Sequence, residues 1–210
     1  MNSRGLILDF GGVLTTRFRS ALTGFCQREG LDPHRLHYVL REDPIGKATL
    51  YEAELGRIRQ REFELRLGKL LGVSDNNLTA RICADLQPCE PMLALVERIR
   101  AAGIKTALLS NSWGAGDYDI YHDYDLQRLF DAIVISDQVG LAKPHPAIYE
   151  LTVDKMGILA TDCVFADDVP LNLEPAGALG MTTVLVDEPA DAVPEIANLF
   201  DLAIGPYPEN

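Results

Sequence analysis

Five short runs of apolar residues stand out along the chain, and polar residues or glycine follow each of them. The runs cover residues 6–10, 105–110, 132–136, 163–167 and 182–187. Within them apolar and polar positions do not alternate, which is typical of strands that are covered on both faces of a parallel sheet. The pattern therefore predicts five buried strands.

Helical periodicity separates the later runs. Met92, Leu95, Val96 and Ile99 fall at positions i, i+3, i+4 and i+7, and Pro91 stands near the start of this segment. Strands that alternate with amphipathic helices are typical of a doubly wound sheet with helices on both faces. The predicted fold class is α/β, with a parallel, Rossmann-like sheet.

The stretch between the first run and Pro88 contains no strand pattern and is expected to be helical. Phe63, Leu67 and Leu71 lie on one face of a helix that Gly72 ends, and Ser74 is expected to cap a second helix with apolar residues at positions 78, 82 and 86. An insert after the first strand lies at the carboxyl edge of the sheet, where such folds bind ligands. We therefore predict a core of residues 1–15 and 88–210 and a small helical cap domain over residues 16–87.

Composition narrows the classes of partner. The chain has 19 Lys and Arg against 31 Asp and Glu, a formal charge of −12, and no basic patch interrupts this acidity. Nucleic acid and anionic membrane surfaces are repelled by such a charge, and no apolar run reaches the roughly 18 residues of a membrane span. We expect no nucleic-acid partner and no membrane partner, and the oligomeric state stays open.

Cysteine usage and the first residues of the chain favour a cytoplasmic protein. The four cysteines form no Cys-x-x-Cys pair and lack a histidine at zinc spacing, so reduced core thiols are the expected state. The largely apolar run at residues 5–10 is too short for the core of a signal peptide and has no small-residue cleavage site behind it.

Acidic residues end two of the predicted strands. Asp9 ends the first strand ahead of Gly11 and Gly12, and Asp167 and Asp168 end the fourth. Taken alone, Asp9 and the glycines are equally consistent with a simple turn. Two adjacent acids at a buried strand end are costly unless a cation offsets them, and carboxylate oxygens suit Mg²⁺. The acids indicate a metal site at the carboxyl edge.

Two further polar positions are ambiguous when each is considered alone. Ser110 and Asn111 end the second strand, where a hydroxyl beside backbone N–H groups suits an anion, although helix capping is the simpler interpretation. Lys143 lies in a loop that opens a helix, and a lone lysine is usually a solvated surface charge.

The four motifs in this order resemble the haloacid dehalogenase superfamily, in its subfamily IA-like branch with a helical cap after the first strand. The segment that begins at Glu54 (Glu-Leu-Gly-Arg-Ile), the Lys143-Pro-x-Pro segment and the Asp167-Asp-x-x-x-Asn172 segment agree with that branch. The resemblance covers essentially the whole chain.

The resemblance implies a role for each motif. Asp9 matches the family's nucleophile, and Ser110 and Lys143 complete its catalytic set. Ser110, Asn111 and Lys143 match the groups that bind phosphate. Mg²⁺ is expected to be held by Asp9, the backbone carbonyl of Gly11 and Asp168, with Asp167 acting mainly through water or by orienting Lys143.

One position departs from the family pattern. Most phosphatases of the family carry a second Asp where this chain has Gly11, and that Asp protonates the leaving group and then deprotonates water. General acid–base help is typically worth about 10²–10⁴-fold in rate. His34 and His37 are candidate substitutes, although surface histidines are the favoured interpretation. A positive φ at Gly11 would make the backbone resist a side chain at that position.

These implications favour a Mg²⁺-dependent hydrolase, a phosphatase of a small phosphorylated metabolite that acts through an aspartyl-phosphate intermediate. Two alternatives stay open. A 2-haloacid dehalogenase also lacks the second acid, but such enzymes work without metal and typically lack the paired acids found at positions 167 and 168. A catalytically weak protein that binds a phosphorylated ligand or a partner fits Gly11 but needs no nucleophile. The substrate itself stays undetermined.

Overall fold

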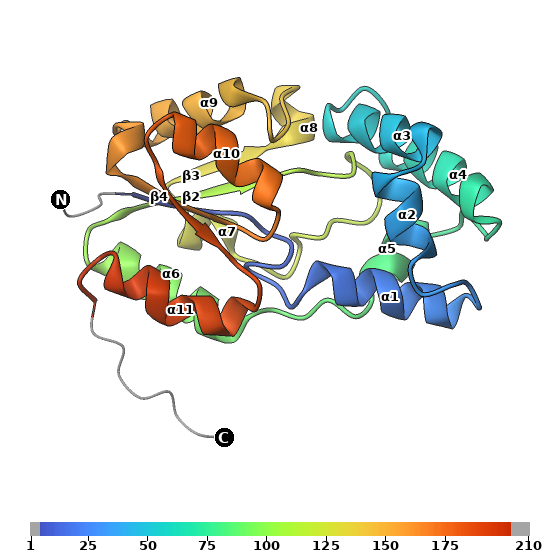
Figure 1. Cartoon of the computed structure of the whole chain (residues 1–210), viewed down its shortest axis with the longest axis horizontal. Helices are drawn as coiled ribbons and strands as arrows, with labels where there is room; N and C mark the ends of the chain where they lie inside the picture. The colour runs from blue at the N-terminus through green and yellow to red at the C-terminus, as the bar shows by residue number, and fades with distance from the viewer. Residues whose placement is uncertain (1–4, 203–210) are drawn as a thin grey trace, which may run out of the picture.

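A computed structural model describes residues 5–202 of the chain, and its centre is a sheet of five parallel strands. The strands are β1 (Gly5–Leu8), β2 (Lys105–Ser110), β3 (Ala132–Ile135), β4 (Cys163–Asp167) and β5 (Thr182–Leu185). Their order in the sheet is β3-β2-β1-β4-β5 (Figure 1). Each strand lies on one of the predicted apolar runs, and the sheet confirms the predicted α/β class.

Helices cover both faces of the sheet. One face carries α6 (Glu90–Ala101) and α11 (Pro189–Asn198), and the other carries α9 (Pro146–Met156) and α10 (Pro170–Ala178) (Figure 1). Two one-turn helices, α7 (Leu126–Leu129) and α8 (Ser136–Val139), flank β3, and a short 3₁₀ helix (Ala160–Asp162) precedes β4. The arrangement is the doubly wound sheet that the alternating pattern predicts.

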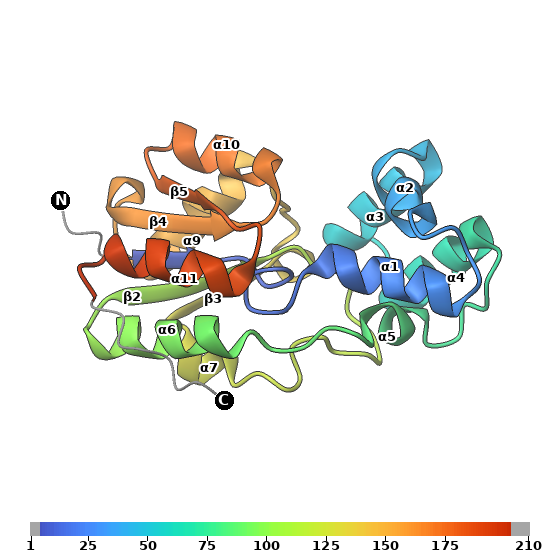
Figure 2. The same ribbon diagram turned by 60° about the horizontal axis from the view of Figure 1, so that its bottom comes forward.

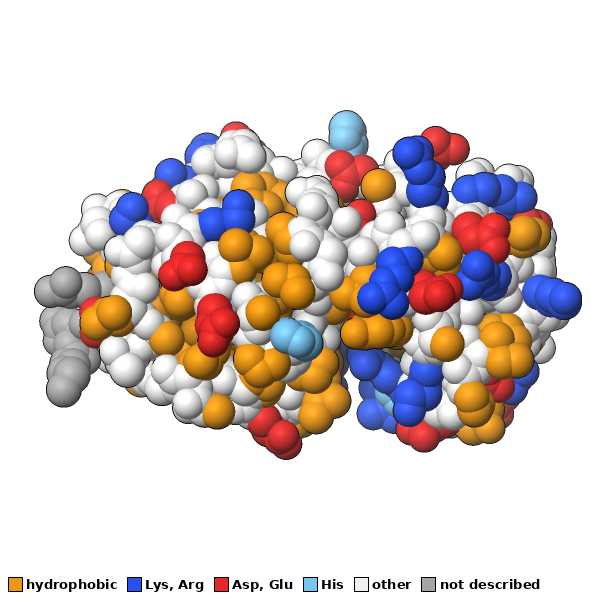
Figure 3. Space-filling view, turned by 90° about the horizontal axis from the view of Figure 1, so that it is seen from above, with side chains coloured by type: hydrophobic (Ala, Val, Ile, Leu, Met, Phe, Trp, Pro, Cys, Tyr) orange, Lys and Arg blue, Asp and Glu red, His pale blue; other side chains and the backbone are white. Residues whose placement is uncertain are grey.

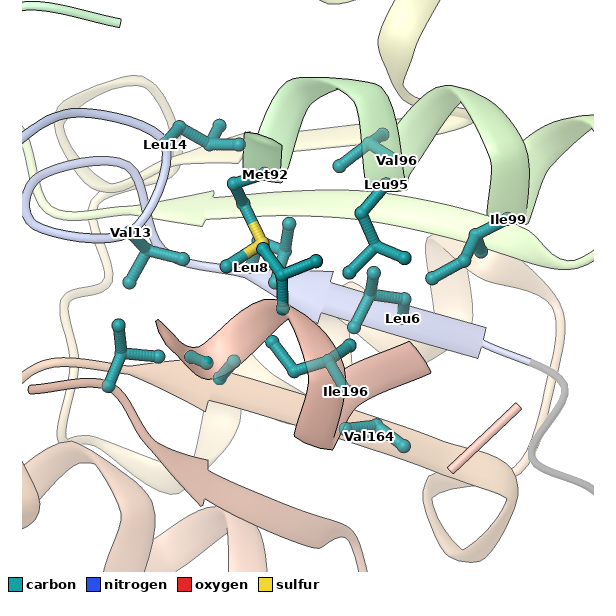
Figure 4. Packing of buried hydrophobic residues seen from close by; sticks show 14 of the residues in the cluster. Leu6, Leu8, Val13, Leu14, Met92, Leu95, Val96, Ile99, Val164 and Ile196 are labelled. Atoms are coloured by element: carbon teal, nitrogen blue, oxygen red, sulfur yellow. The ribbon is translucent and has the colours of Figure 1, made fainter. Parts of the chain in front are cut away.

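The core explains why the strands lack polar alternation. Leu6 and Leu8 of β1 point toward α6 and α11, where Leu95 and Ile196 lie (Figure 4). The side chain between them, Ile7, points to the opposite face of the sheet and packs in a second apolar cluster. Leu6, Ile7 and Leu8 are all fully buried. Because both faces are covered by helices, both sets of alternating positions are apolar.

Five helices between β1 and α6 pack against one another beside the sheet, and we refer to residues 18–83 as the helical group. They are α1 (Phe18–Arg28), α2 (Arg35–Arg41), α3 (Pro44–Glu54), α4 (Gln60–Leu71) and α5 (Leu78–Cys83). Figures 1 and 2 show the group at the end of the molecule away from α9 and α11. It has its own buried apolar cluster, which includes Phe25, Phe63 and Leu67.

The two chain segments that connect the sheet with the helical group lie side by side. Thr15 and Pro88 form an isolated antiparallel bridge, Thr16 N donates to Gln87 O at 2.8 Å, and Cys89 N donates to the carbonyl of the residue before Thr15 at 2.8 Å. The predicted domain boundaries at 15/16 and 87/88 fall in these two segments, and the division into two domains stays a prediction.

Two local predictions in the helical group had different outcomes. Gly72 ends α4 in the left-handed conformation, with φ of 73°, as predicted. The capping prediction for Ser74 is wrong, because α5 starts later, after Asn77, and the Ser74 hydroxyl instead accepts a hydrogen bond from Asn76 N at 3.2 Å. The side chain of Ser74 therefore closes a turn within the loop, four residues before the first residue of α5.

Residues 5–202 include no helix of the length and apolar character that a membrane span requires. All four cysteines are buried and free, as predicted for core thiols.

Candidate active site

The carboxyl ends of three adjacent strands bring the predicted polar residues together. Asp9 directly follows β1, and its backbone N–H still donates to the carbonyl of Ala166 in β4 at 3.0 Å. Ser110 is the last residue of β2 and Asp167 is the last residue of β4. Since β1 lies between β2 and β4, the three side chains meet at one edge of the sheet.

Lys143 reaches into this edge from the loop before α9. Its Nζ atom lies 2.7 Å from Asp9 Oδ1 and 2.7 Å from Asp167 Oδ2, and the residue is 4% exposed. The side chain of Asn111 holds the loop in place, since Asn111 Oδ1 accepts from Lys143 N at 2.9 Å and Asn111 Nδ2 donates to Lys143 O at 3.0 Å. Lys143 is therefore a buried cation shared by two carboxylates, and its surroundings exclude the surface interpretation.

The charges of Lys143 and Asp9 depend on each other. Burial alone lowers the pKa of Lys143, but Asp167 and Asp9 outweigh burial and raise that pKa above its ordinary value, so the amine stays protonated. Burial raises the pKa of Asp9 to about 6, although Lys143 opposes this rise and Asp167 adds to it. A buried carboxylate in contact with a cation is a suitable nucleophile at neutral pH.

Three carboxylates gather beside this lysine. Oxygens of Asp9, Asp167 and Asp168 all lie within 4.8 Å of one another. Both oxygens of Asp167 are already engaged, because they accept hydrogen bonds from Asn172 Nδ2 at 3.0 and 3.1 Å and Oδ2 also accepts from Lys143. Asp9 and Asp168 retain free lone pairs, so they are better placed than Asp167 to hold a metal ion directly.

The site has an excess of negative charge that a divalent cation would neutralise. Burial, Asp9 and Asp167 raise the pKa of Asp168 to about 7. One lysine offsets at most one of the three carboxylates, and an all-oxygen donor set of this kind suits Mg²⁺. The residues present therefore fit the predicted metal.

Asp168→Asn is expected to stabilise the metal-free protein. The raised pKa means that folded Asp168 binds its proton more tightly than the unfolded residue does, so its contribution falls as pH rises from about 4 to about 7. The variant should match wild type near pH 4 and exceed its free energy of unfolding by about 1–2 kcal/mol at pH 8. Urea unfolding in EDTA at both pH values measures this difference, and a gain of equal size at both would contradict the electrostatic account.

The two glycines after Asp9 have different structural roles. Gly12 has φ of +78°, and a Cβ atom there would lie 2.5 Å from Asp168 Oδ2, so this position requires glycine. Gly11 is absent from the positive-φ glycines of the described residues, and a Cβ atom there would lie 3.1 Å from an edge atom of the Phe18 ring. The anticipated positive φ therefore belongs to Gly12, and at Gly11 a small shift of one ring would admit a side chain.

A cavity of about 1150 Å³ lies between the carboxyl edge of the sheet and the helical group. Its floor contains Asp9, Gly11, Ser110, Asn111, Lys143 and Asp168. Aromatic side chains form part of its wall, among them Phe18 of α1 and Trp113, whose ring centroids are 5.3 Å apart. Figure 3 shows the furrow between the two parts of the molecule. The predicted site residues other than Asp167, which is fully buried, thus line one cavity.

The helical group is much less acidic than the rest of the chain. Residues 18–83 contain 11 Lys and Arg and 9 Asp and Glu, whereas the remaining residues contain 8 and 22. Basic side chains are accordingly prominent on this group in Figure 3. Two of them, Arg41 and Lys47, line the cavity. The cavity therefore has cations on the side that faces the carboxylate cluster, an arrangement that favours an anionic ligand.

Three residues that line the cavity were not assigned roles from the sequence. Tyr121 has its hydroxyl 2.9 Å from Ser110 Oγ, and thereby orients the serine. Arg41 ends α2 and Glu54 ends α3, and both face the site from the helical group. Of these three residues, only Glu54 lies in a segment whose sequence resembles the family.

Neither of the histidines considered as substitutes for the missing acid lines the cavity. His34 precedes α2 and His37 lies within it, and both are outside the set of residues that face the site. His145 caps α9, with Nδ1 accepting from Ala147 N at 3.2 Å. These histidines therefore supply no acid at the predicted reaction centre.

Comparisons with known proteins cover both sequence and structure. A family model described as haloacid dehalogenase-like hydrolase matches residues 4–180. Acyl-CoA dehydrogenase family member 10 of Mus musculus is 34% identical over 116 residues, which are 54% of this chain and 11% of that protein. Phosphatase MT3486 of Mycobacterium tuberculosis is 32% identical over 93 residues, which are 44% of this chain and 43% of that protein. The matches thus span less than half the length of each of these relatives.

A solved structure with a similar fold comes from Bacteroides thetaiotaomicron. It is a HAD family enzyme in complex with magnesium and inorganic phosphate, with a TM-score of 0.67 and 24% sequence identity. The match covers 89% of this chain and 96% of that one. At this identity the likeness is one of fold.

Proposed function

The chain belongs to the haloacid dehalogenase-like hydrolase family, and on that premise we propose that it is a Mg²⁺-dependent phosphatase of a small phosphorylated metabolite. This membership confirms the resemblance drawn from the strand-end motifs. One observation carries the proposal: Lys143 Nζ bridges Asp9 and Asp167 at 2.7 Å each, beside Asp168, at the floor of a cavity. A carboxylate suited to act as a nucleophile, a cation and a carboxylate cluster that could hold a metal ion are combined there, whereas a binding protein needs no nucleophile.

We propose that Asp9 attacks phosphorus and forms an aspartyl phosphate, which water then hydrolyses. Lys143 holds a phosphoryl oxygen and offsets the charge that Asp9 brings toward an anionic substrate. Ser110, oriented by Tyr121, donates a hydrogen bond from its hydroxyl to a second phosphoryl oxygen. The side chain of Asn111 holds the backbone of Lys143 in place.

Asp9, Asp168 and the Gly11 carbonyl are the groups we propose as Mg²⁺ ligands, with Asp167 supporting them through Lys143. When bound there, Mg²⁺ supplies the remaining positive charge that brings a carboxylate and a phosphoryl group together. The Bacteroides structure of similar fold, with its magnesium and phosphate, supports this choice of ion. The engaged oxygens of Asp167 support its indirect role.

The helical group is proposed as a cap domain, over residues 16–87, that selects the substrate. Arg41 and Lys47 provide charge above the site, while Phe18 and Trp113 provide apolar wall. A phosphorylated metabolite with an apolar portion suits this combination. Because the cavity between cap and sheet has a volume of only about 1150 Å³, a small molecule fits the proposal better than a folded protein partner.

Hydrolysis of a panel of phosphorylated metabolites and 4-nitrophenyl phosphate, with Mg²⁺ and with EDTA, tests the proposal. We expect phosphate release that requires Mg²⁺ and is lost in EDTA. Release of halide from 2-haloacids without metal would instead identify a dehalogenase. Binding of phosphorylated compounds without turnover of any of them would identify a ligand-binding protein and would refute the phosphatase.

A further inference from the structure

The proposed phosphatase lacks an acid at Gly11, and in-line chemistry fixes where a replacement must lie. In an in-line displacement the leaving oxygen departs on the side of phosphorus opposite the attacking oxygen. Asp9 approaches from the sheet, so the leaving oxygen faces the helical group. A proton donor for that oxygen must therefore come from the wall of the cavity that the helical group provides.

Glu54 occupies that wall. Among residues 18–83, all of which the structure describes, it is the only Asp or Glu that lines the cavity. It is the last residue of α3 and is partly buried. The other acids that line the cavity belong to the loops that follow the strands and to α8.

The backbone after α3 fixes this position. Gly56, two residues beyond Glu54, has φ of +67°, and a Cβ atom there would lie 2.3 Å from the carbonyl oxygen of Asp137. The turn at the end of α3 therefore lies directly against α8, which follows β3. This contact joins the helical group to the sheet beside the site and holds Glu54 over it.

The surroundings of Glu54 permit both of its protonation states. Burial raises its pKa to about 7, and Asp9 adds to this rise, whereas Arg41 of α2, a hydrogen bond with the Asn111 side chain, and Lys143 oppose it. Asp137 of α8 is the further acid near this contact. A group that gives up a proton and then takes one back works best when its pKa lies near the working pH.

We propose that Glu54 is the general acid and general base of this site and replaces the acid that is absent at Gly11. The inference rests on the proposed phosphatase activity. In the first step Asp9 forms a bond to phosphorus, the bond from phosphorus to the leaving oxygen breaks, and Glu54 gives its proton to that oxygen. In the second step ionised Glu54 takes a proton from water as the water oxygen bonds to phosphorus. The bond from phosphorus to Asp9 breaks, its electron pair returns to the Asp9 carboxylate, and phosphate leaves.

Glu54→Gln tests this role, with Glu52→Gln as the matched control. Glu52 lies on the same helix, but it pairs with Arg66 and does not line the cavity. We expect Glu54→Gln to lower kcat/KM for alkyl phosphates by about 10²–10⁴-fold, because the alkoxide then leaves without a proton. The loss on 4-nitrophenyl phosphate, whose leaving group needs little protonation, should be at least about tenfold smaller. Glu52→Gln should keep wild-type rates on both.

The pH profile gives a second readout that a structural role would not change. For wild type, kcat/KM on alkyl phosphates should fall as pH rises through the pKa of Glu54, because the protonated form is the acid. Glu54→Gln should lose this fall. Adding Gly11→Asp to Glu54→Gln should recover at least about tenfold on alkyl phosphates, since a small shift of the Phe18 ring admits a side chain at Gly11.

Two outcomes would overturn the role of Glu54 while the phosphatase stands. One is an equal loss on both substrate classes, which would indicate a positioning effect. The other is a loss selective for alkyl phosphates in Asp137→Asn but not in Glu54→Gln, since Asp137 also lines the cavity and its Oδ1 has no hydrogen-bond partner among the described residues. Absence of Mg²⁺-dependent phosphate release from wild type would instead overturn the proposed function itself.

Discussion

Asp9→Asn is expected to abolish Mg²⁺-dependent phosphate release, by at least about 10³-fold, the scale of losses when a hydrolase loses its nucleophile. An amide is a poor nucleophile and a weaker ligand for Mg²⁺ than a carboxylate. The fold should survive, because burial already raises the pKa of Asp9 to about 6 and a neutral side chain removes that cost. Steady-state phosphate release measures the loss, and circular dichroism with thermal unfolding checks the fold.

Retention of more than a few per cent of the wild-type rate by a folded Asp9→Asn variant would contradict the assignment. The nucleophile would then be another group or water. Asp168→Asn serves as the comparison here, because loss of a metal ligand should be relieved in part by a higher Mg²⁺ concentration, whereas loss of the nucleophile should not.

Lys143→Met is expected to lower both stability and activity. Lys143 is 4% exposed and lies 2.7 Å from both Asp9 and Asp167, so its removal leaves two buried carboxylates without their cation. Breaking a buried ion pair on one side costs about 3–5 kcal/mol. The cost should be smaller at pH 5 than at pH 8, because Asp9, with a pKa of about 6, takes up a proton at the lower pH.

Urea unfolding of Lys143→Met in EDTA at the two pH values measures this effect, with Lys47→Met as the control. Lys47 also lines the cavity but is exposed, so its replacement should change the free energy of unfolding by less than about 0.5 kcal/mol. Equal effects of the two substitutions would show that Lys143 does not offset buried charge. A cost for Lys143→Met that does not change with pH would separate its role from the charge of Asp9.

The sheet and the floor of the site follow from the sequence because both depend on short segments. Each apolar run became a strand, and the residues that end strands of a parallel sheet must meet at one edge. Asp9, Ser110 and Asp167 could therefore be placed together from the sequence alone. The paired acids at positions 167 and 168 also indicated a cation nearby, but only the family resemblance placed Lys143 there, where the structure now finds it.

The residues that the helical group contributes to the site could not be predicted from the sequence in this way. Glu54 and Arg41 end different helices, and their approach to the sheet depends on how those helices pack. The close contact of Gly56 with the backbone of Asp137 is a tertiary feature without a local signal. The residue with positive φ could not be identified from the sequence for the same reason. A pair of glycines predicts a turn, but only the packing against Asp168 shows that Gly12 is the glycine with positive φ.

Binding of beryllium fluoride, a mimic of the phosphoryl group that attaches to aspartate, tests the central claim most directly. Fluorine NMR of the wild-type protein with beryllium fluoride and Mg²⁺ should show a protein-bound signal. The account predicts that this signal disappears in EDTA and in Asp9→Asn, and that it persists in Glu52→Gln. A bound signal that survives in folded Asp9→Asn, or no bound signal in a wild-type protein that hydrolyses phosphate esters, would contradict the aspartyl-phosphate mechanism.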